Sequence, residues 1–457
     1  MQTVASTASS VPPLTLAEHI RGTLSLAVPV MLARAGVVIM MTVATVMTGR
    51  KGGQELAYLG ISLAPQITML TVGVGLLVGT IVLTAQADGA GEQQRCGRIW
   101  RLSLVIGFAL GVMYAIILLE GEDILRLLGQ PQDIVAGGGK ALAMLSLGLL
   151  PILMFAATSF FLEGIGRPRP GMVVSLAANF VNAGLGWILI YGHFGMPAMG
   201  AAGATLALSI TNWFMFLTLA GYVFVMPDGA RYGVRASLVG HLGAVRALLV
   251  MGGPLALAIG LESSAFAATA TFAGWIGTES LAGYQVALNV VALVYMLSIG
   301  LSTATAVRVA NAVGRSDPVD LRRAGWVGAG LVLVLMIVIA VAIALARDPI
   351  AAFYTDDPAV RAVAVTALGI VAWIVVVDGT QGVLMGAMRG AADLVVPTAT
   401  YAVSYWALTV PLGYYLGVHD GRGIPGLMWS LFAGLVMAAV LLGGRFQVIS
   451  GRPIRPA

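Results

Sequence analysis

Long apolar stretches separated by short polar ones recur along the whole chain. Each is near the roughly 20 residues that a helix needs to cross the hydrocarbon core of a bilayer. They are too long and too continuously apolar for the strands of a membrane barrel, which alternate with a period of two. They predict twelve transmembrane helices, near 24–48, 57–84, 102–119, 141–162, 171–191, 203–226, 247–274, 281–307, 325–346, 362–386, 394–417 and 424–444.

The two halves of this pattern resemble each other. Pro29 and Gly75 recur as Pro254 and Gly300, each 225 positions later, and a later block repeats at an offset of 222. Six helices per half is an even number, so both halves enter the membrane with the same polarity. Parallel repeats of this kind occur in secondary transporters. We therefore expect an all-α membrane protein with two six-helix lobes related by a parallel pseudo-twofold repeat.

The helix pattern divides the chain into five parts. We expect a flexible cytoplasmic tail over 1–20, an N-lobe over 21–226, a cytoplasmic linker over 227–246, a C-lobe over 247–444 and a cytoplasmic C-terminal tail over 445–457. The N-terminal tail lacks the positive start and the apolar centre of a signal peptide.

Composition narrows the class of protein. Hydrophobic residues make up 59% of the chain and charged residues 10%, whereas a soluble domain is about 25% charged. This excludes a soluble enzyme, a nucleic-acid-binding protein and a disordered chain. The sequence contains no P-loop motif, and its four histidines show no metal-ligand spacing. We expect no cofactor, and we expect transport to draw on an ion gradient.

The distribution of Lys and Arg predicts the orientation. With the N-terminus inside, the inner loops and tails hold seventeen of the 25 basic residues, Arg389 among them, and the outer loops hold seven. The bias predicts a multi-pass membrane protein with both termini in the cytoplasm. The remaining basic residue, Arg34, lies within segment 1, and no acid is expected at similar depth in its own half. It could face a water-filled cavity or reach across it.

Two acidic residues, Glu262 and Asp378, lie deep within segments 7 and 10. The other eighteen fall in loops, in tails or at segment ends. A charge at membrane depth costs about 2.5–3.5 kcal/mol on insertion scales, so it implies a partner, water or a function. The repeat places no acid at the matching positions of the first half. We therefore expect the pair to bind the coupling ion, either as proton acceptors or as oxygen ligands of Na⁺. The alternative is a pair of structural acids neutralised by protonation or by Arg34.

Further polar residues could support the ion or the substrate, although an ordinary interhelical hydrogen bond is the favoured interpretation for each of them. These residues are Ser263, Ser264, Gln285, Asn289 and Gln381 in the C-lobe and Asn179 and Asn182 in the N-lobe.

Four other residues are candidates for gating or ion entry. Pro29 and Pro254 lie inside helices and could kink them, or be tolerated without a gating role. Asp356 and Asp357 could concentrate cations at an outer mouth, or form a solvated loop with a turn at Pro358.

Several stretches carry a resemblance to a known family. They are VATVMTGRKGGQELA at 43–57, the stretch from PRPGMVV to GAAGA at 168–204, the stretch from GGPLALAIGLESS to YQVALN at 252–289 and MRGAADLVVPT at 388–398. In order and spacing the chain resembles the multidrug and toxic compound extrusion (MATE) family, bacterial type.

The resemblance implies two six-helix lobes that alternate between inward-open and outward-open states. Members generally export organic cations in exchange for Na⁺ or H⁺, and Glu262 and Asp378 stand where the family has its segment-7 glutamate and segment-10 aspartate. Many members also carry an aspartate in segment 1, where this chain has Ala44. A first-lobe carboxylate mechanism is therefore absent, and Arg34 weakens the case for a strongly cationic substrate.

The sequence thus favours an antiporter that exports organic, drug-like, cationic compounds in exchange for Na⁺ or H⁺. Its expected partners are the substrate and the lipid bilayer, without nucleic acid. The repeat completes a pathway in one chain, so a monomer suffices. The alternative is a flippase or exporter of a lipid-linked, neutral or anionic metabolite. A membrane-embedded enzyme would need a nucleophile or metal ligands at depth, which the sequence does not show, and the lopsided charge pair disfavours a symmetric channel.

Overall fold

The computed structural model describes residues 15–127, 129–236 and 242–452, and within these ranges all regular structure is helical. The first half contains α1 (Leu16–Lys51), α2 (Gly53–Leu77), α3 (Gly79–Gly89), α4 (Gln93–Leu119), α5 (Gly121–Leu127), α6 (Gln132–Ser146), α7 (Leu149–Gly164), α8 (Arg169–Tyr191) and α9 (Gly200–Val225). The second half contains α10 (Leu242–Ile276), α11 (Thr278–Gly314), α12 (Pro318–Tyr354), α13 (Pro358–Gly390), α14 (Val395–Tyr401), η1 (Ala402–Thr409), α15 (Val410–Gly413), η2 (Tyr414–His419) and α16 (Gly423–Ile449).

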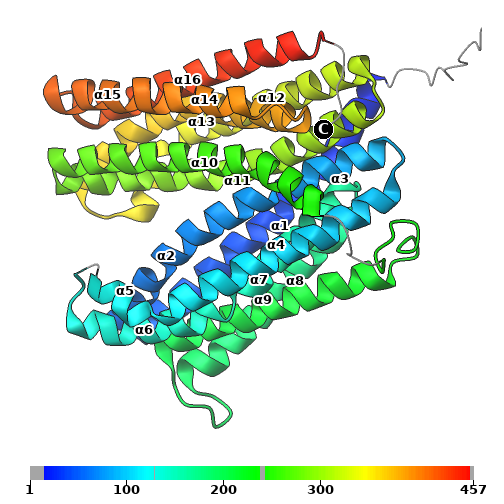
Figure 1. The fold of residues 1–457 in the computed structure, drawn as a ribbon. Helices are drawn as coiled ribbons and strands as arrows, with labels where there is room; N and C mark the ends of the chain where they lie inside the picture. Colours follow the sequence, from blue (N-terminus) through cyan, green and yellow to red (C-terminus); the bar gives the residue numbers. More distant parts are fainter. Residues whose placement is uncertain (1–14, 128, 237–241, 453–457) are drawn as a thin grey trace, which may run out of the picture.

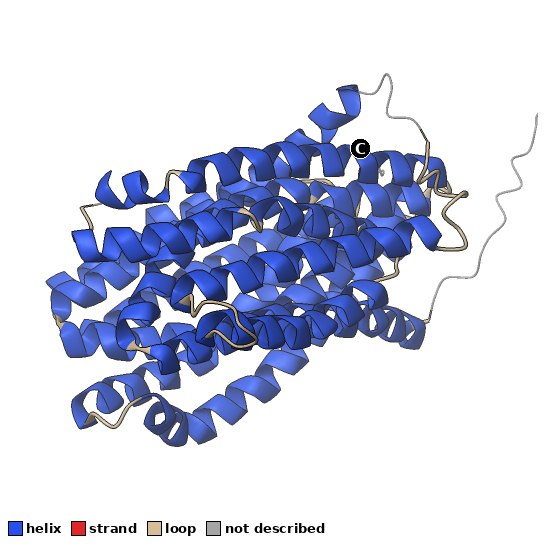
Figure 2. Cartoon of the chain, turned by 90° about the horizontal axis from the view of Figure 1, so that it is seen from below, coloured by secondary structure: helices blue, strands red, loops and turns tan. Residues whose placement is uncertain are grey.

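All twelve predicted segments are helical in the structure. Within the described ranges, ten helical spans are long and apolar enough to cross a bilayer, with α2 and α3 together forming one of them. An eleventh segment is the pair α6 and α7, which is bent by 42°. The twelfth runs without interruption from α14 to η2 and contains wide π-helical turns. Seen from below, the helices share one general direction, as bilayer-spanning helices do (Figure 2).

The bend between α6 and α7 follows from the local sequence. Pro151 has no backbone N–H, so the carbonyl of Leu147 loses its helical partner. The indole Nε1 of Trp213 donates to that carbonyl at 3.1 Å, and Asn212 Nδ2 donates to the carbonyl of Gly148 at 3.3 Å. Both donors come from α9. The carbonyl of Gly148 also keeps its helical partner, the N–H of Ile152, at 3.2 Å. Without water in the hydrocarbon core, the indole of Trp213 satisfies the carbonyl that Pro151 frees, which allows a broken membrane helix.

The N-lobe (α1–α9) and the C-lobe (α10–α16) converge at one end of the molecule and diverge towards the other (Figure 1). At the closed end, α1 and α3 pack against α11, and α2 packs against α10. The lobes touch closely there, because a Cβ added to Gly75 would lie 2.9 Å from the Cα of Ala256. Arg308 also donates to Thr23 across the lobes at 3.3 Å. The divergent end carries α5, α6 and α15.

The outer surface is apolar over much of its area. Phe180 and Leu345 are each 82% exposed and Trp373 is 62% exposed. Exposed apolar area on this scale is unfavourable in water and is expected where lipid is the solvent.

The structure moves three of the expected domain boundaries. α1 begins at Leu16, inside the expected tail, because Thr15 and Glu18 form a capping box in which each side chain bonds the other's backbone. α10 begins at Leu242 and α16 continues to Ile449. Within the expected tails and linker, residues 1–14, 237–241 and 453–457 lie outside the described residues.

Candidate functional site

A hydrogen-bonded cluster surrounds Glu262 in the C-lobe. Glu262 projects from α10, Gln381 from α13 and Tyr405 from η1. The hydroxyl of Tyr405 lies 2.8 Å from Glu262 Oε1 and 3.1 Å from Gln381 Oε1, so its single proton can serve either acceptor. Gln381 Nε2 lies 3.4 Å from Glu262 Oε1 and 3.0 Å from the hydroxyl of Tyr401. Three helices thus hold one carboxylate with neutral donors.

Asp378 lies beside this cluster. It precedes Gln381 by three residues on α13, so the two side chains share one face of the helix. Asp378 is only 4% exposed, and no hydrogen bond or ion pair of its side chain is found among the described residues. It interacts electrostatically with Glu262, and both carboxylates interact with Tyr295 of α11. The structure therefore brings together the two acids that the sequence singled out.

The tyrosines of this cluster were missed at the sequence level. Tyr401 and Tyr405 are four residues apart, and their rings pack edge to face at a centroid distance of 5.3 Å. Two tyrosines at helical spacing inside an otherwise apolar segment were the available signal. Tyr405 lies in a π-helical turn, a departure from regular helix that is frequent at functional sites.

The other C-lobe candidates lie outside the cluster. Ser264 receives the indole N–H of Trp406 at 3.2 Å. Ser263, Gln285 and Asn289 are exposed, and Asn289 Oδ1 accepts from the hydroxyl of Tyr354 at 2.7 Å. Of the C-lobe polar candidates, Gln381 is the one that bonds a carboxylate of the pair.

The two N-lobe asparagines make contacts within their own lobe. Asn182 is 2% exposed and lies 3.4 Å from Thr211 Oγ1 of α9, which joins α8 to α9. Asn179 Nδ2 donates to the carbonyl of Ser175 at 2.9 Å and lies close to Gly36 of α1, and its Oδ1 is buried without a partner. Asn182 thus makes an interhelical hydrogen bond, which is the alternative to a substrate contact that the sequence offered.

Arg34 has a partner in its own lobe, contrary to the sequence expectation. Its Nη2 atom lies 3.6 Å from Oε1 of Glu163 on α7, and its guanidinium carbon lies 5.6 Å from the ring centre of Phe160. Glu163 is 4% exposed and also accepts from Ser159 at 3.0 Å. The acid was placed at a segment end because depth was counted along the chain. Arg34 lies midway along α1, and its side chain, which leans towards the start of that helix, meets the last turn of α7.

Arg389 joins the same region from the C-lobe. The sequence placed it in an inner loop, but it lies in the last turn of α13 and is partly buried. It interacts electrostatically with both Glu163 and Arg34. We call Arg34, Glu163 and Arg389 the arginine cluster.

The structure also places the two outer aspartates and the two prolines. Asp357 caps α13 by accepting from the backbone N–H groups of Ala359 and Val360 at 2.8 and 3.4 Å. Asp356 is exposed beside it. The helices α1 and α10 continue through Pro29 and Pro254.

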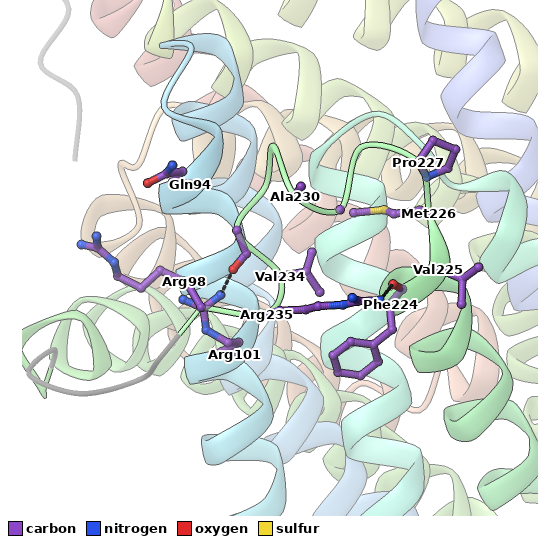
Figure 3. A pocket seen from close by; sticks show the side chains of 13 residues that line it. Gln94, Arg98, Arg101, Phe224, Val225, Met226, Pro227, Ala230, Val234 and Arg235 are labelled. Atoms are coloured by element: carbon purple, nitrogen blue, oxygen red, sulfur yellow. Dashed lines mark hydrogen bonds between the residues drawn. The ribbon is translucent and has the colours of Figure 1, made fainter.

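A separate basic pocket lies at the closed end (Figure 3). It is bounded by α4 and by the loop after α9, with Arg98, Arg101 and Arg235 in its lining. Arg235 donates to the carbonyl of Phe224 at 3.0 Å. Behind the loop, burial raises the pKa of Tyr232 to about 12, so its hydroxyl stays protonated and donates to Asp88 at 3.2 Å. These contacts fix the loop at one side of the lobes.

The amino-acid sequence is similar to those of known proteins. A family model described as MatE matches it twice, over residues 29–188 and 254–415, and the starts of the matches are separated by the repeat offset of 225. The probable multidrug resistance protein NorM of Caulobacter vibrioides is 33% identical over 435 residues, which is 95% of this chain and 92% of the relative. The multidrug resistance protein NorM of Burkholderia vietnamiensis is 33% identical over 449 residues, 97% of this chain and 96% of the relative.

Solved structures share the fold. The eukaryotic MATE transporter AtDTX14 superposes with a TM-score of 0.85 at 20% identity, covering 95% of this chain and 96% of that one. An outward-facing conformation of a multidrug resistance MATE family transporter of the MOP superfamily also reaches 0.85, at 19% identity, covering 96% and 100%. The predicted fold class is confirmed.

Proposed function

Since the chain belongs to the MatE family of membrane transporters, we propose that it is a secondary antiporter that exports organic, drug-like compounds in exchange for Na⁺ or H⁺. The names of its NorM relatives support multidrug export as the activity. The positive-inside bias supports a bacterial inner-membrane location with both termini in the cytoplasm. In that orientation the closed end faces the cytoplasm and the lobes diverge outwards.

The observation that carries the proposal is the Glu262 cluster with Asp378 beside it. The two carboxylates repel each other, and the hydrogen-bond donors of the site, Tyr405 and Gln381, are neutral. A cation, either H⁺ or Na⁺, is what relieves their repulsion. Because no fixed positive charge is paired with them among the described residues, that cation can be exchanged.

Exchange becomes coupled when ion and substrate favour different states of the lobes. An ion that binds the outward-facing state more tightly shifts the population towards it. This lowers the apparent affinity for a substrate that binds the other state, and the coupling is reciprocal. The same exchange follows if the substrate and the ion compete for the carboxylates. One chain contains both lobes, so we propose that the monomer is the transporting unit.

The test is transport in proteoliposomes. A fluorescent organic cation is loaded, and an inward Na⁺ gradient and an inward proton gradient are imposed separately. We expect one gradient to drive export and the double variant E262Q/D378N to lower the coupled rate at least about 100-fold, since the exchangeable charge is gone. E279Q, which removes an exposed carboxylate from the first turn of α11, is the matched control. Gradient-driven export that persists in the double variant would exclude this mechanism.

A second candidate keeps the same fold but changes the cargo. A flippase or exporter of an anionic or lipid-linked metabolite would need positive charge between the lobes, and Arg34 and Arg389 supply some. Two arginines suit a substrate with a single acidic group, whereas a pyrophosphate needs a more basic cavity. Export of a lipid-linked anion, without export of organic cations, would favour this candidate.

A further inference from the structure

Two guanidinium groups in the arginine cluster lack hydrogen-bond acceptors. The Nε atoms of Arg34 and Arg389 are both buried without a partner. Arg34 has one long ion pair, at 3.6 Å, and Arg389 has no hydrogen bond or ion pair within the described ranges. Each guanidinium carries five N–H donors in a fixed fork. A buried N–H that lacks an acceptor is costly, so each of the two guanidinium groups can take a further acceptor.

The charge count points in the same direction. Two positive groups share one negative group, Glu163, and one Glu163 oxygen is already bonded by Ser159. The net charge of the cluster is therefore +1, which a single added anionic group would neutralise.

The internal repeat shows that this deficit is specific to one place. At the offset of 222, Arg389 matches Arg167 of the first half. Arg167 forms an ion pair and a hydrogen bond with Asp228. At this matching position of the repeat, the first half has an arginine that is paired with a carboxylate. The second half has an arginine without such an ion pair.

The two arginines come from different lobes. Arg34 belongs to α1 and is 28% exposed along its side chain, and Arg389 belongs to the end of α13 and is also partly exposed. A ligand bound between the lobes can therefore contact both. Guanidinium forks match a carboxylate with two parallel hydrogen bonds, which makes arginine well suited to recognise acidic groups.

We propose that Arg34 and Arg389 form an anion-binding subsite for an acidic group of the transported compound. The proposal rests on the transport function proposed above and specifies its substrate class: amphipathic organic compounds that bear a carboxylate, either as anions or as zwitterions. In a zwitterion, the cationic group lies towards the C-lobe carboxylates and the acidic group contacts the arginine cluster.

The test compares the binding of two dyes to the purified full-length protein. One is a rhodamine with a free carboxylate, and the other is the methyl ester of the same dye, so the pair differs in a single charge. Binding is followed by fluorescence polarisation. We expect the wild type to bind the carboxylate dye about 10-fold more tightly than the ester, the effect of one or two charge-assisted hydrogen bonds.

The variants locate that preference. R34Q and R389Q should each remove most of it by weakening the binding of the carboxylate dye, while ester binding stays within about 2-fold and reports an intact fold. R389K, which keeps the charge but not the fork, should retain part of it. R347Q, an exposed arginine in an ion pair with Asp348, is the control and should change nothing.

Several results would overturn the inference. Equal affinities for the two dyes in the wild type, binding of neither dye, or a preference that survives both glutamine variants would each do so. An equal loss for both dyes in R34Q and R389Q would instead assign the cluster to closure between the lobes. The antiport proposal is tested separately, because E262Q/D378N abolishes gradient-driven export without removing the preference for the carboxylate dye.

Discussion

Glu262 in the C-lobe and Glu163 in the N-lobe are both acids inside a membrane protein, but their neighbours differ. Glu262 is held by the neutral donors Tyr405 and Gln381, with a second acid nearby. Glu163 faces Arg34 at 3.6 Å and is within electrostatic reach of Arg389. The first environment leaves a negative site that a mobile cation can fill, whereas the second fixes a permanent cation and leaves a positive surplus.

This difference shows how two lobes with the same fold can carry different charges. The two lobes have the same helices in the same order, and the repeat places Val37 opposite Glu262 and Met385 opposite Glu163. Each acid therefore has an apolar residue at the matching position of the other lobe, so the scaffold is duplicated but the charge is not. Four measurements would sharpen this contrast or break it.

The largest effect is expected in transport, where the two acids should not be equivalent. E262Q alone should lower gradient-driven export at least about 10-fold, because it removes an exchangeable charge. E163Q should leave export responsive to the same gradient. Rates are measured in proteoliposomes at matched protein content. If E163Q abolished the response to the gradient, coupling would not be confined to the C-lobe.

For the free energy of unfolding, E163Q should have a larger effect than E262Q. E163Q leaves Arg34 and Arg389 without a counter-charge and should cost about 2 kcal/mol, below the range for fully buried pairs because Arg34 is 28% exposed. E262Q keeps an oxygen that accepts from Tyr405 and should cost under about 1 kcal/mol. The midpoint of thermal unfolding in detergent should fall by several degrees for E163Q and little for E262Q. Equal shifts would contradict the contrast.

The hydroxyl of Tyr405 should tune ion affinity. Its bond to Glu262 Oε1, at 2.8 Å, stabilises the ion-free carboxylate and so competes with the coupling ion. Y405F should therefore tighten apparent binding of that ion by about 5- to 10-fold. Y401F, whose hydroxyl bonds Gln381 instead, is the matched control and should change it by less than about 2-fold. Weaker ion binding in Y405F would mean that the hydroxyl is itself a ligand.

The smallest effect is expected at Ser159, which donates to Glu163 Oε1 at 3.0 Å. S159A removes one hydrogen bond while the ion pair with Arg34 remains, so it should cost about 1 kcal/mol. In an E163Q background the same change should cost less, because the charged acceptor has gone. Additive losses in the double variant would show that Ser159 acts through other contacts.

The sequence predicted the scaffold and half of the chemistry. The twelve spans followed from apolar length, and Glu262 and Asp378 stood out because carboxylates at depth are costly. It missed Tyr401 and Tyr405, because the search for residues out of place at membrane depth picked out charged side chains, and a tyrosine is neutral. It misplaced Glu163 and Arg389, because both lie near segment ends, where charges are usually solvated.

The sequence by itself determined what lies in the membrane, since hydropathy and helix length depend on composition along the chain alone. It also determined that the halves repeat and that two acids are out of place. Only the tertiary structure decided which charges meet. Arg34 and Glu163 are far apart in the chain, and Arg389 belongs to the other lobe. Their meeting depends on helix packing between the lobes, which brings the middle of α1 near the last turns of α7 and α13.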